Sequence, residues 1–65
     1  MQFRVNDMMC NHCVMHITKS INAKDPAAKV QCNVTTKMVV VDSSLDESTV
    51  MQAIKDAGYT PQPVK

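Results

Sequence analysis

The first six residues of the chain alternate between polar and apolar side chains, the apolar ones being Met1, Phe3 and Val5. This period of two predicts a strand with one face on a core and the other in water. After residue 11 the spacing lengthens to three and four, as on one side of an α-helix, with apolar residues at Val14, Ile17 and Ile21. Asn11 is a candidate N-cap and Asp25-Pro26 cannot continue a helix, so we expect a helix over residues 12–23.

The middle of the chain predicts two more strands. Apolar residues alternate with polar ones at Val30, Cys32 and Val34, and residues 38–41 form a continuous apolar run. Because Thr35-Thr36 can turn, the two segments are typical of an antiparallel hairpin. The periodicity leaves open which side chains of residues 38–41 face inward, since all four are apolar.

The last third of the chain predicts a second helix and a final extended segment. Asp46 or Ser44 can cap this helix near residue 46, and its apolar stripe consists of Val50, Ala53, Ile54 and Ala57. Gly58 follows the stripe, where a helix often ends in a left-handed residue. Two prolines restrict residues 59–64 to an edge strand or an extended tail.

The expected order of elements is therefore βαββαβ. Two βαβ halves with right-handed crossovers predict an α+β fold of the ferredoxin-like class, a four-stranded antiparallel sheet with both helices on one face. A length of 65 residues allows one domain, residues 1–65.

Composition and charge exclude several classes of function. Seven Lys and Arg against six Asp and Glu give a net charge of +1 without a basic run, which argues against nucleic-acid binding. No apolar stretch approaches the roughly 20 residues that span a bilayer, and residues 1–25 lack the pattern of a signal peptide, so we expect no membrane insertion. Three cysteines in a chain without an export signal favour a reducing, cytoplasmic location.

The side chains with metal or redox chemistry lie together in residues 7–13. Cys10 and Cys13 are three residues apart, the second within the first helical turn, so both thiols can face one small volume. Backbone N–H groups and the helix dipole stabilise thiolate there. Thiolates select Cu(I), zinc or iron–sulfur clusters, and the last two usually take about four protein ligands, so two thiolates favour Cu(I). A dithiol redox motif at a helix start is an alternative interpretation.

Met8 precedes these cysteines in the pattern Met8-x-Cys10-x-x-Cys13, and Ala57-Gly58-Tyr59 follows the second predicted helix. With these motifs the chain resembles, over essentially its whole length, the heavy-metal-associated (HMA) domain family and its small bacterial copper chaperones. The resemblance implies a non-enzymatic carrier whose Cys10 and Cys13 bind Cu(I). It also implies that thiolate exchange passes the ion to the metal-binding domain of a copper-transporting P-type ATPase.

The resemblance assigns further roles to individual side chains. It implies that Met8 packs beneath the metal-binding loop, that Tyr59 closes over the site, and that Val39 and Val41 are the inward pair of their strand. An exposed two-thiolate site can also share its metal between two copies, so a metal-bridged homodimer is a second expected assembly. Met1 and the absence of linker tails favour a free chaperone over a module of an ATPase.

Two residues depart from the pattern of the family, which commonly has glycine at the position of Asp7 and threonine at that of Met9. A carboxylate at residue 7 favours a divalent ion, so a binder of zinc, cadmium or mercury using Asp7 or His12 as a further ligand is a second interpretation. Met9 is expected to be an exposed apolar contact for a partner, and Cys32 a small hydrophobe in the core. His16 is expected to lie on the solvated surface.

Three lysines in residues 19–29 allow two interpretations. They either form a basic docking face or only keep the protein in solution, and they are Lys19, Lys24 and Lys29.

Overall fold

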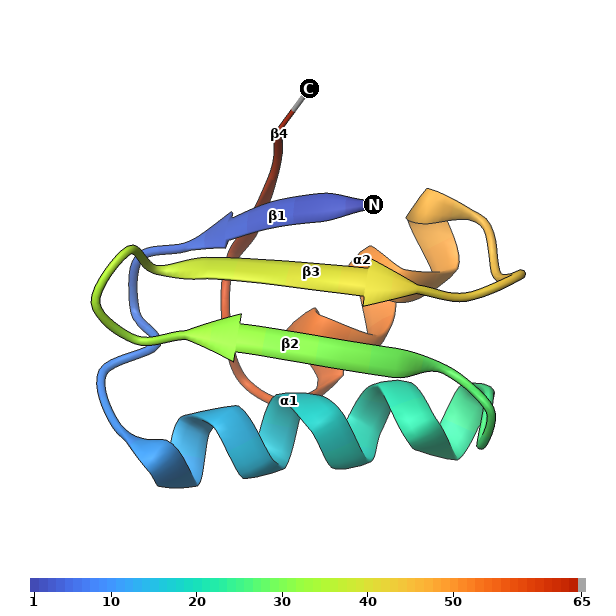
Figure 1. Cartoon of the computed structure of the whole chain (residues 1–65), viewed down its shortest axis with the longest axis horizontal. Helices are drawn as coiled ribbons and strands as arrows, with labels where there is room; N and C mark the ends of the chain where they lie inside the picture. Colours follow the sequence, from blue (N-terminus) through green and yellow to red (C-terminus); the bar gives the residue numbers. More distant parts are fainter. Residues whose placement is uncertain (65) are drawn as a thin grey trace.

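The computed structural model describes residues 1–64. Its elements run in the order β1 (Gln2–Val5), α1 (Asn11–Lys24), β2 (Lys29–Asn33), β3 (Met38–Asp42), α2 (Glu47–Asp56) and β4 (Pro61–Val64). The strands form one sheet in the order β2-β3-β1-β4, every neighbouring pair is antiparallel, and both helices cover one face (Figure 1). This arrangement confirms the predicted ferredoxin-like fold, including the edge strand at β4. Among residues 1–64, neither helix combines the length and the apolar character that crossing a membrane requires.

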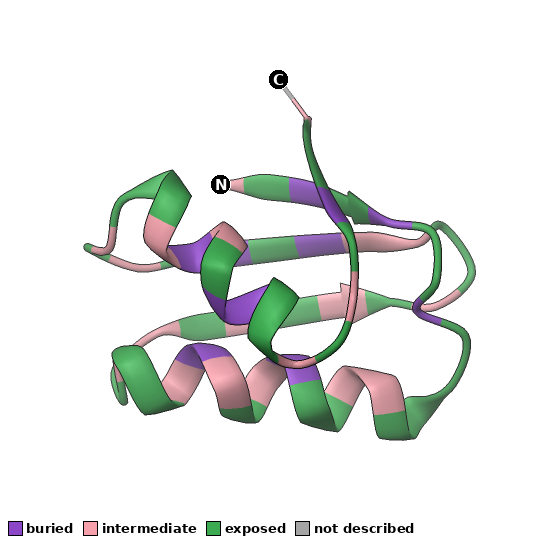
Figure 2. Cartoon of the chain, turned by 180° about the vertical axis from the view of Figure 1, so that it is seen from behind, coloured by how far each residue is buried: buried purple, intermediate pink, exposed green. Residues whose placement is uncertain are grey.

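The core lies between the sheet and the two helices (Figure 2). Its buried side chains are Phe3, Val5, Met8, Ile17, Ile21, Val39, Val41, Val50, Ala53 and Ile54. Val39 and Val41 are 0% and 2% exposed, whereas Val40 between them is 38% exposed. The inward face of β3, which the apolar run left open, is therefore the one that the family resemblance implied.

The start of α1 differs from the prediction that Asn11 caps this helix. Cys10 is the N-cap, with extended backbone angles of φ −154° and ψ 171°, and Asn11 is the first helical residue. The carbonyl of Cys10 accepts hydrogen bonds from the backbone N–H groups of Cys13 and Val14 at 3.1 and 3.3 Å, as expected of the residue that caps the helix. No side chain caps this end, and the first turn contains no acidic residue. Both cysteines lie at this N-terminal end of α1, where the helix dipole is positive.

The end of β2 also differs slightly from the prediction, because Val34 lies in the turn rather than in the strand. The side-chain oxygen of Asn33 accepts hydrogen bonds from the backbone N–H groups of Thr35 and Thr36 at 2.9 and 3.1 Å. This local turn competes with strand pairing and ends β2 at Asn33.

Both ends of α2 form as the sequence indicates. Asp46 is the N-cap, and its carboxylate accepts a hydrogen bond from the backbone N–H of Thr49 at 3.3 Å. At the other end Gly58 has φ +97°, and its N–H donates to the carbonyl of Lys55 at 2.9 Å. The N–H of Tyr59 donates to the carbonyl of Ile54 at 3.3 Å, which completes a Schellman motif. This turn directs Tyr59 towards the N-terminus of α1.

Candidate metal site

The two cysteines predicted as ligands lie beside each other. Cys10 ends the loop after β1 and Cys13 lies in the first turn of α1, with 3.4 Å between their sulfur atoms. Cys10 is exposed and Cys13 is half-buried, and both are free thiols. Cys10 is therefore open to solvent, whereas Cys13 is partly covered by neighbouring residues of the fold.

The Cys13 thiol is surrounded by hydrogen-bond donors. The hydroxyl of Tyr59 is the main one, and with backbone hydrogen bonds from Met9 and the neighbouring Cys10 thiol it lowers the pKa of Cys13 to about 7. The same interaction with Cys13 is the main reason why the pKa of Tyr59 is raised to about 12. Tyr59 consequently stays protonated at neutral pH, and its hydroxyl donates a hydrogen bond to the Cys13 sulfur, which is about half ionised at that pH.

Replacing Tyr59 by phenylalanine tests this interaction. Because Tyr59→Phe removes the largest of the effects that lower the Cys13 pKa, we expect this pKa to rise from about 7 towards the ordinary thiol value. Less Cys13 thiolate would then be present at neutral pH, and alkylation there would slow. The measurement is a pH titration of the Cys13 ¹³Cβ shift by NMR in the metal-free protein.

Thr60→Val is the matched control, since it changes the adjacent exposed residue but retains the phenol. We expect its Cys13 titration to follow that of the unsubstituted protein. An unchanged Cys13 titration in Tyr59→Phe would show that the phenol does not stabilise the thiolate.

The loop that carries the cysteines is fastened by residues far away in the sequence. The ammonium group of Lys37 donates to the carbonyl of Met8 at 2.9 Å, and the backbone carbonyl of Lys37 accepts from the N–H of Val5 at 2.7 Å. The carboxylate of Asp7 accepts from the backbone N–H of Thr60 at 3.3 Å, which ties the same loop to the segment of Tyr59. No local pattern in the sequence predicts this role of Lys37, because its hydrogen-bond partner Met8 is 29 residues away.

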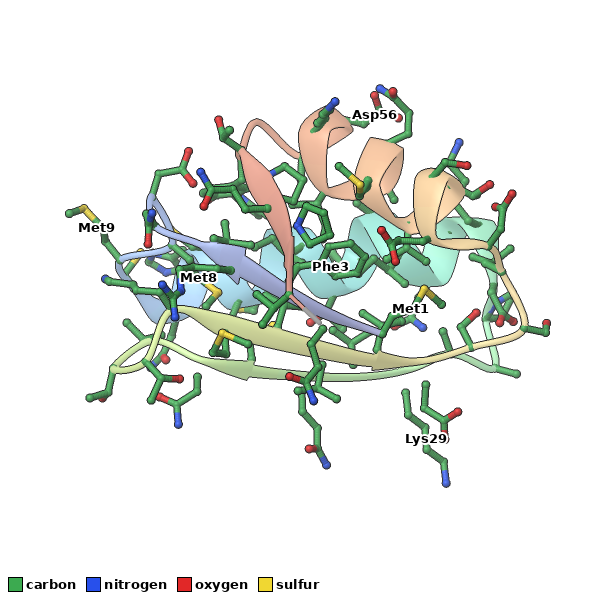
Figure 3. All side chains as sticks on the ribbon, turned by 90° about the horizontal axis from the view of Figure 1, so that it is seen from above. Met1, Phe3, Met8, Met9, Lys29 and Asp56 are labelled. Atoms are coloured by element: carbon green, nitrogen blue, oxygen red, sulfur yellow. The ribbon has the colours of Figure 1, made fainter. Side chains whose placement is uncertain are left out.

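The two methionines of this loop have opposite surroundings (Figure 3). Met8 is 0% exposed and belongs to the core, whereas Met9 is 72% exposed at the edge of the molecule. This confirms the expected packing of Met8 beneath the loop and the expected exposure of Met9.

No third ligand of the usual kinds joins the thiol pair. Within residues 1–64, no group of three or more His, Cys, Asp and Glu side chains is placed to hold one metal ion, so neither Asp7 nor His12 completes a larger set. Cys32 is half-buried on β2 and packs against the core as expected, and burial raises the pKa of its thiol. The site thus offers two sulfur ligands, a number that suits Cu(I) better than a structural zinc ion.

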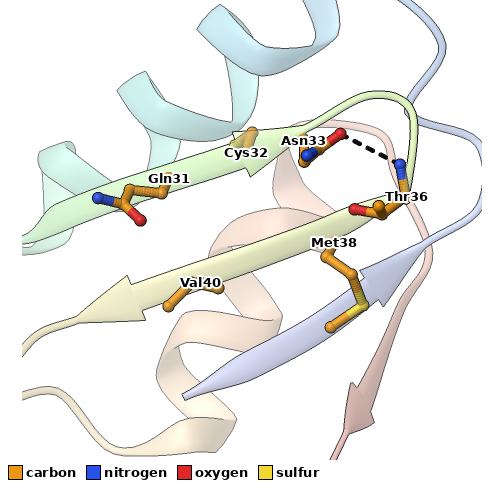
Figure 4. A pocket seen from close by; sticks show the side chains of 6 residues that line it. All are labelled: Gln31, Cys32, Asn33, Thr36, Met38 and Val40. Carbon is orange, nitrogen blue, oxygen red and sulfur yellow. Dashed lines mark hydrogen bonds between the residues drawn. The ribbon is translucent and has the colours of Figure 1, made fainter.

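A surface hollow on the sheet shares no residue with the thiol pair. It has a volume of about 340 Å³ and lies over β2, β3 and their turn, lined by Gln31, Cys32, Asn33, Thr36, Met38 and Val40 (Figure 4). Its lining has amide, hydroxyl, thiol and apolar groups but no charged side chain. The candidate chemistry of this chain is therefore at the start of α1.

The fold and this site together define a small α+β domain with an exposed dithiol at the N-terminus of its first helix. The chain belongs to the heavy-metal-associated domain family, whose sequence profile matches residues 2–60. The copper chaperone CopZ of Enterococcus hirae is 30% identical over 61 residues, which are 89% of this chain and 88% of CopZ. The copper chaperone Atx1 of Synechocystis, in its Cu2 form, has a similar structure with a TM-score of 0.94 and 32% identity, covering 95% of this chain and 98% of Atx1.

A much longer protein also contains a similar segment. Copper-transporting ATPase 2 of Rhizobium meliloti is 34% identical over 62 residues, which are 92% of this chain. The chain spans 8% of the length of that ATPase. The chain is thus a copper-chaperone-like HMA domain, and similar domains occur both in small chaperones and within a transporter.

Proposed function

We propose that this chain is a cytoplasmic Cu(I) chaperone formed by one domain, residues 1–65. In this proposal Cys10 and Cys13 bind one Cu(I) ion and deliver it to an HMA domain of a copper-transporting P-type ATPase. The observation that carries the proposal is the pair of thiols with 3.4 Å between their sulfur atoms at an uncapped helix N-terminus. A protein that carries copper needs such an open site, because the ion has to leave again.

Delivery would proceed by ligand exchange without a redox step. A thiolate of the partner attacks the two-coordinate Cu(I) from the exposed side, where Cys10 lies, and a three-coordinate intermediate forms. One sulfur of this chain then leaves as thiolate or takes up a proton. The Tyr59 hydroxyl and the backbone hydrogen bonds to Cys13 stabilise the Cys13 sulfur as an anion after the ion departs.

Exposed side chains on the metal-binding loop and along α1 are candidate contacts for a docking partner. Met9 and Met15 are 72% and 52% exposed, on the metal-binding loop and on α1, and offer an apolar contact. Helix α1 carries Lys19 and Lys24 and no acidic residue, so an acidic partner surface would be favoured. The similarity to an ATPase segment as well as to chaperones supports a partner domain of the same fold. Without such a partner, the open site also permits a homodimer bridged by its metal.

Transfer of Cu(I) under argon tests the proposal. The loaded chain is mixed with a metal-free HMA domain from a copper-transporting ATPase, the proteins are separated by ion exchange, and copper is measured in each. We expect copper to distribute between the two domains much faster than the loaded chain releases it to a chelator that does not bind protein. This difference in rate is the mark of direct exchange through a shared intermediate.

A transfer rate that equals release to the chelator would contradict the chaperone proposal, even if the chain binds Cu(I) tightly.

A competition experiment between Cu(I) and Zn²⁺ in the same preparation measures which of the two ions the chain prefers. The matched variant is Asp7→Gly, and we expect it to leave the preference for Cu(I) unchanged because the Asp7 carboxylate binds the N–H of Thr60.

A further inference from the structure

Two histidines occupy neighbouring positions on the exposed side of α1. His12 and His16 are four residues apart within a continuous helix, Asn11–Lys24, and both are exposed. Residues at this spacing are neighbours on a helix surface, with Cβ atoms about 5–6 Å apart. Two imidazoles so placed can turn their ring nitrogens towards a single ion, as the two histidines of helical His-x-x-x-His zinc motifs do.

This pair faces away from the core and is separate from the thiol site. With 3.6 residues per turn, His16 and His12 lie about 100° and 140° around the helix from the buried Ile17. Cys13 lies on the inner side, where it is half-buried and hydrogen-bonded to Tyr59. Since no three His, Cys, Asp and Glu side chains within residues 1–64 converge on one point, the histidines do not extend the dithiol into a larger ligand set.

From this geometry we infer that His12 and His16 form a second metal site, which binds borderline divalent cations such as Ni²⁺, Zn²⁺ or Cu²⁺. Imidazole nitrogen suits these ions, whereas the thiolate pair favours a soft monovalent ion. The two imidazoles supply two ligands, and water or a group from a partner fills the remaining positions. The chain can then carry a divalent ion on the outer side of α1 while its thiols are free or loaded, so the inference does not depend on the proposed function.

The surroundings of the pair define a site of moderate affinity. Lys19 follows His16 by three positions, and its positive charge opposes a second cation. No carboxylate on α1 offsets this charge. Affinity must therefore come from chelation, in which the helix holds the second imidazole close to an ion that is already bound to the first.

A Ni²⁺ titration of the Cys10→Ser/Cys13→Ser chain tests the inference without competition from the two thiols. Binding is followed by calorimetry at about pH 7.5, where free imidazole is largely unprotonated. We expect one equivalent to bind, and we expect His12→Gln or His16→Gln to weaken binding about 100-fold because the chelate is lost. Visible absorption bands of Ni²⁺ with nitrogen ligands provide a second readout.

The matched control moves one histidine without changing their number. His16→Gln combined with Ala23→His keeps two exposed imidazoles on α1 but separates them by 11 positions, about 16 Å along the helix axis. We expect this variant to bind as weakly as the single substitutions. Equal Ni²⁺ affinity in the control and in the parent chain would overturn the inference, as would binding to the parent no tighter than to one imidazole.

The chain with its cysteines intact gives an independent comparison in case the serine variant does not fold. Unsubstituted protein and His16→Gln/Ala23→His are titrated with Ni²⁺ under argon, and the difference in bound equivalents is measured. We expect the unsubstituted protein to bind one equivalent more. Equal stoichiometry and affinity in the two chains would show that the spacing of the histidines has no role, and would overturn the inference.

Discussion

Replacing both Cys10 and Cys13 by serine is expected to abolish binding of one equivalent of Cu(I). A serine hydroxyl is a hard ligand that stays protonated at neutral pH, so the variant offers no soft anion at the start of α1. Either single substitution leaves one thiolate and removes the chelate, and we expect it to weaken binding about 100-fold or more. The measurement is an anaerobic Cu(I) titration against a competing chelator of known affinity.

Cys32→Ser is the matched control for this experiment. It makes the same chemical change at a half-buried thiol on β2, away from the start of α1. We expect the control to keep the full Cu(I) affinity of the unsubstituted chain, although it loses some stability because a hydroxyl replaces a packed sulfur. Binding of one equivalent by the double variant, with the affinity unchanged, would refute the assignment of Cys10 and Cys13 as ligands.

The second large effect is expected from Met8→Ala. Met8 is 0% exposed, so its truncation leaves a cavity beneath the metal-binding loop, and losses of this kind are about 2–5 kcal/mol. A domain of this size has a free energy of unfolding of only about 3–10 kcal/mol, so the variant would lose a large part of its stability. Urea unfolding followed by circular dichroism measures this change.

Met8→Leu separates the packing of this residue from its thioether. Leucine has a similar volume and no sulfur, so we expect a loss below about 1.5 kcal/mol and an unchanged Cu(I) affinity. A well-folded Met8→Leu variant that binds Cu(I) much more weakly would show that the sulfur of Met8 is a ligand. The role of Met8 as a core residue would then be wrong.

Much of the fold could be predicted because its signals are local. The alternation around Phe3 and the helical spacing of Ile17 and Ile21 each describe one element without reference to the others. Asp46 and Gly58 act on backbone groups within a few positions of themselves, so their roles at the two ends of α2 were also readable. The prediction for Asn11 failed because Ncap preferences are only statistical, and the chain enters α1 with Cys10 in that position.

The candidate ligands were predictable for the same reason, since Cys10 and Cys13 are close in sequence and a helix start brings their thiols together. The hydrogen bonds that hold the loop around these two thiols could not be predicted from local patterns. The ammonium of Lys37 reaches Met8 across 29 positions, and Asp7 reaches Thr60 across 53. No short-range pattern encodes such pairs, because they depend on how the sheet places its loops at one end of the molecule.

Local patterns along the chain were thus sufficient to predict the order of the elements, the dithiol at the start of the first helix, and the spacing of His12 and His16, because each depends on a few consecutive residues. A fully apolar run carries no period, so the tertiary structure was needed to establish that Val39 and Val41, the pair that the family resemblance implied, face inward in β3. The tertiary structure also decided that Asp7 holds the loop through the N–H of Thr60 instead of joining the thiols, and that Tyr59 donates to Cys13. These contacts exist only once two loops, distant in the sequence, meet beside the N-terminus of α1.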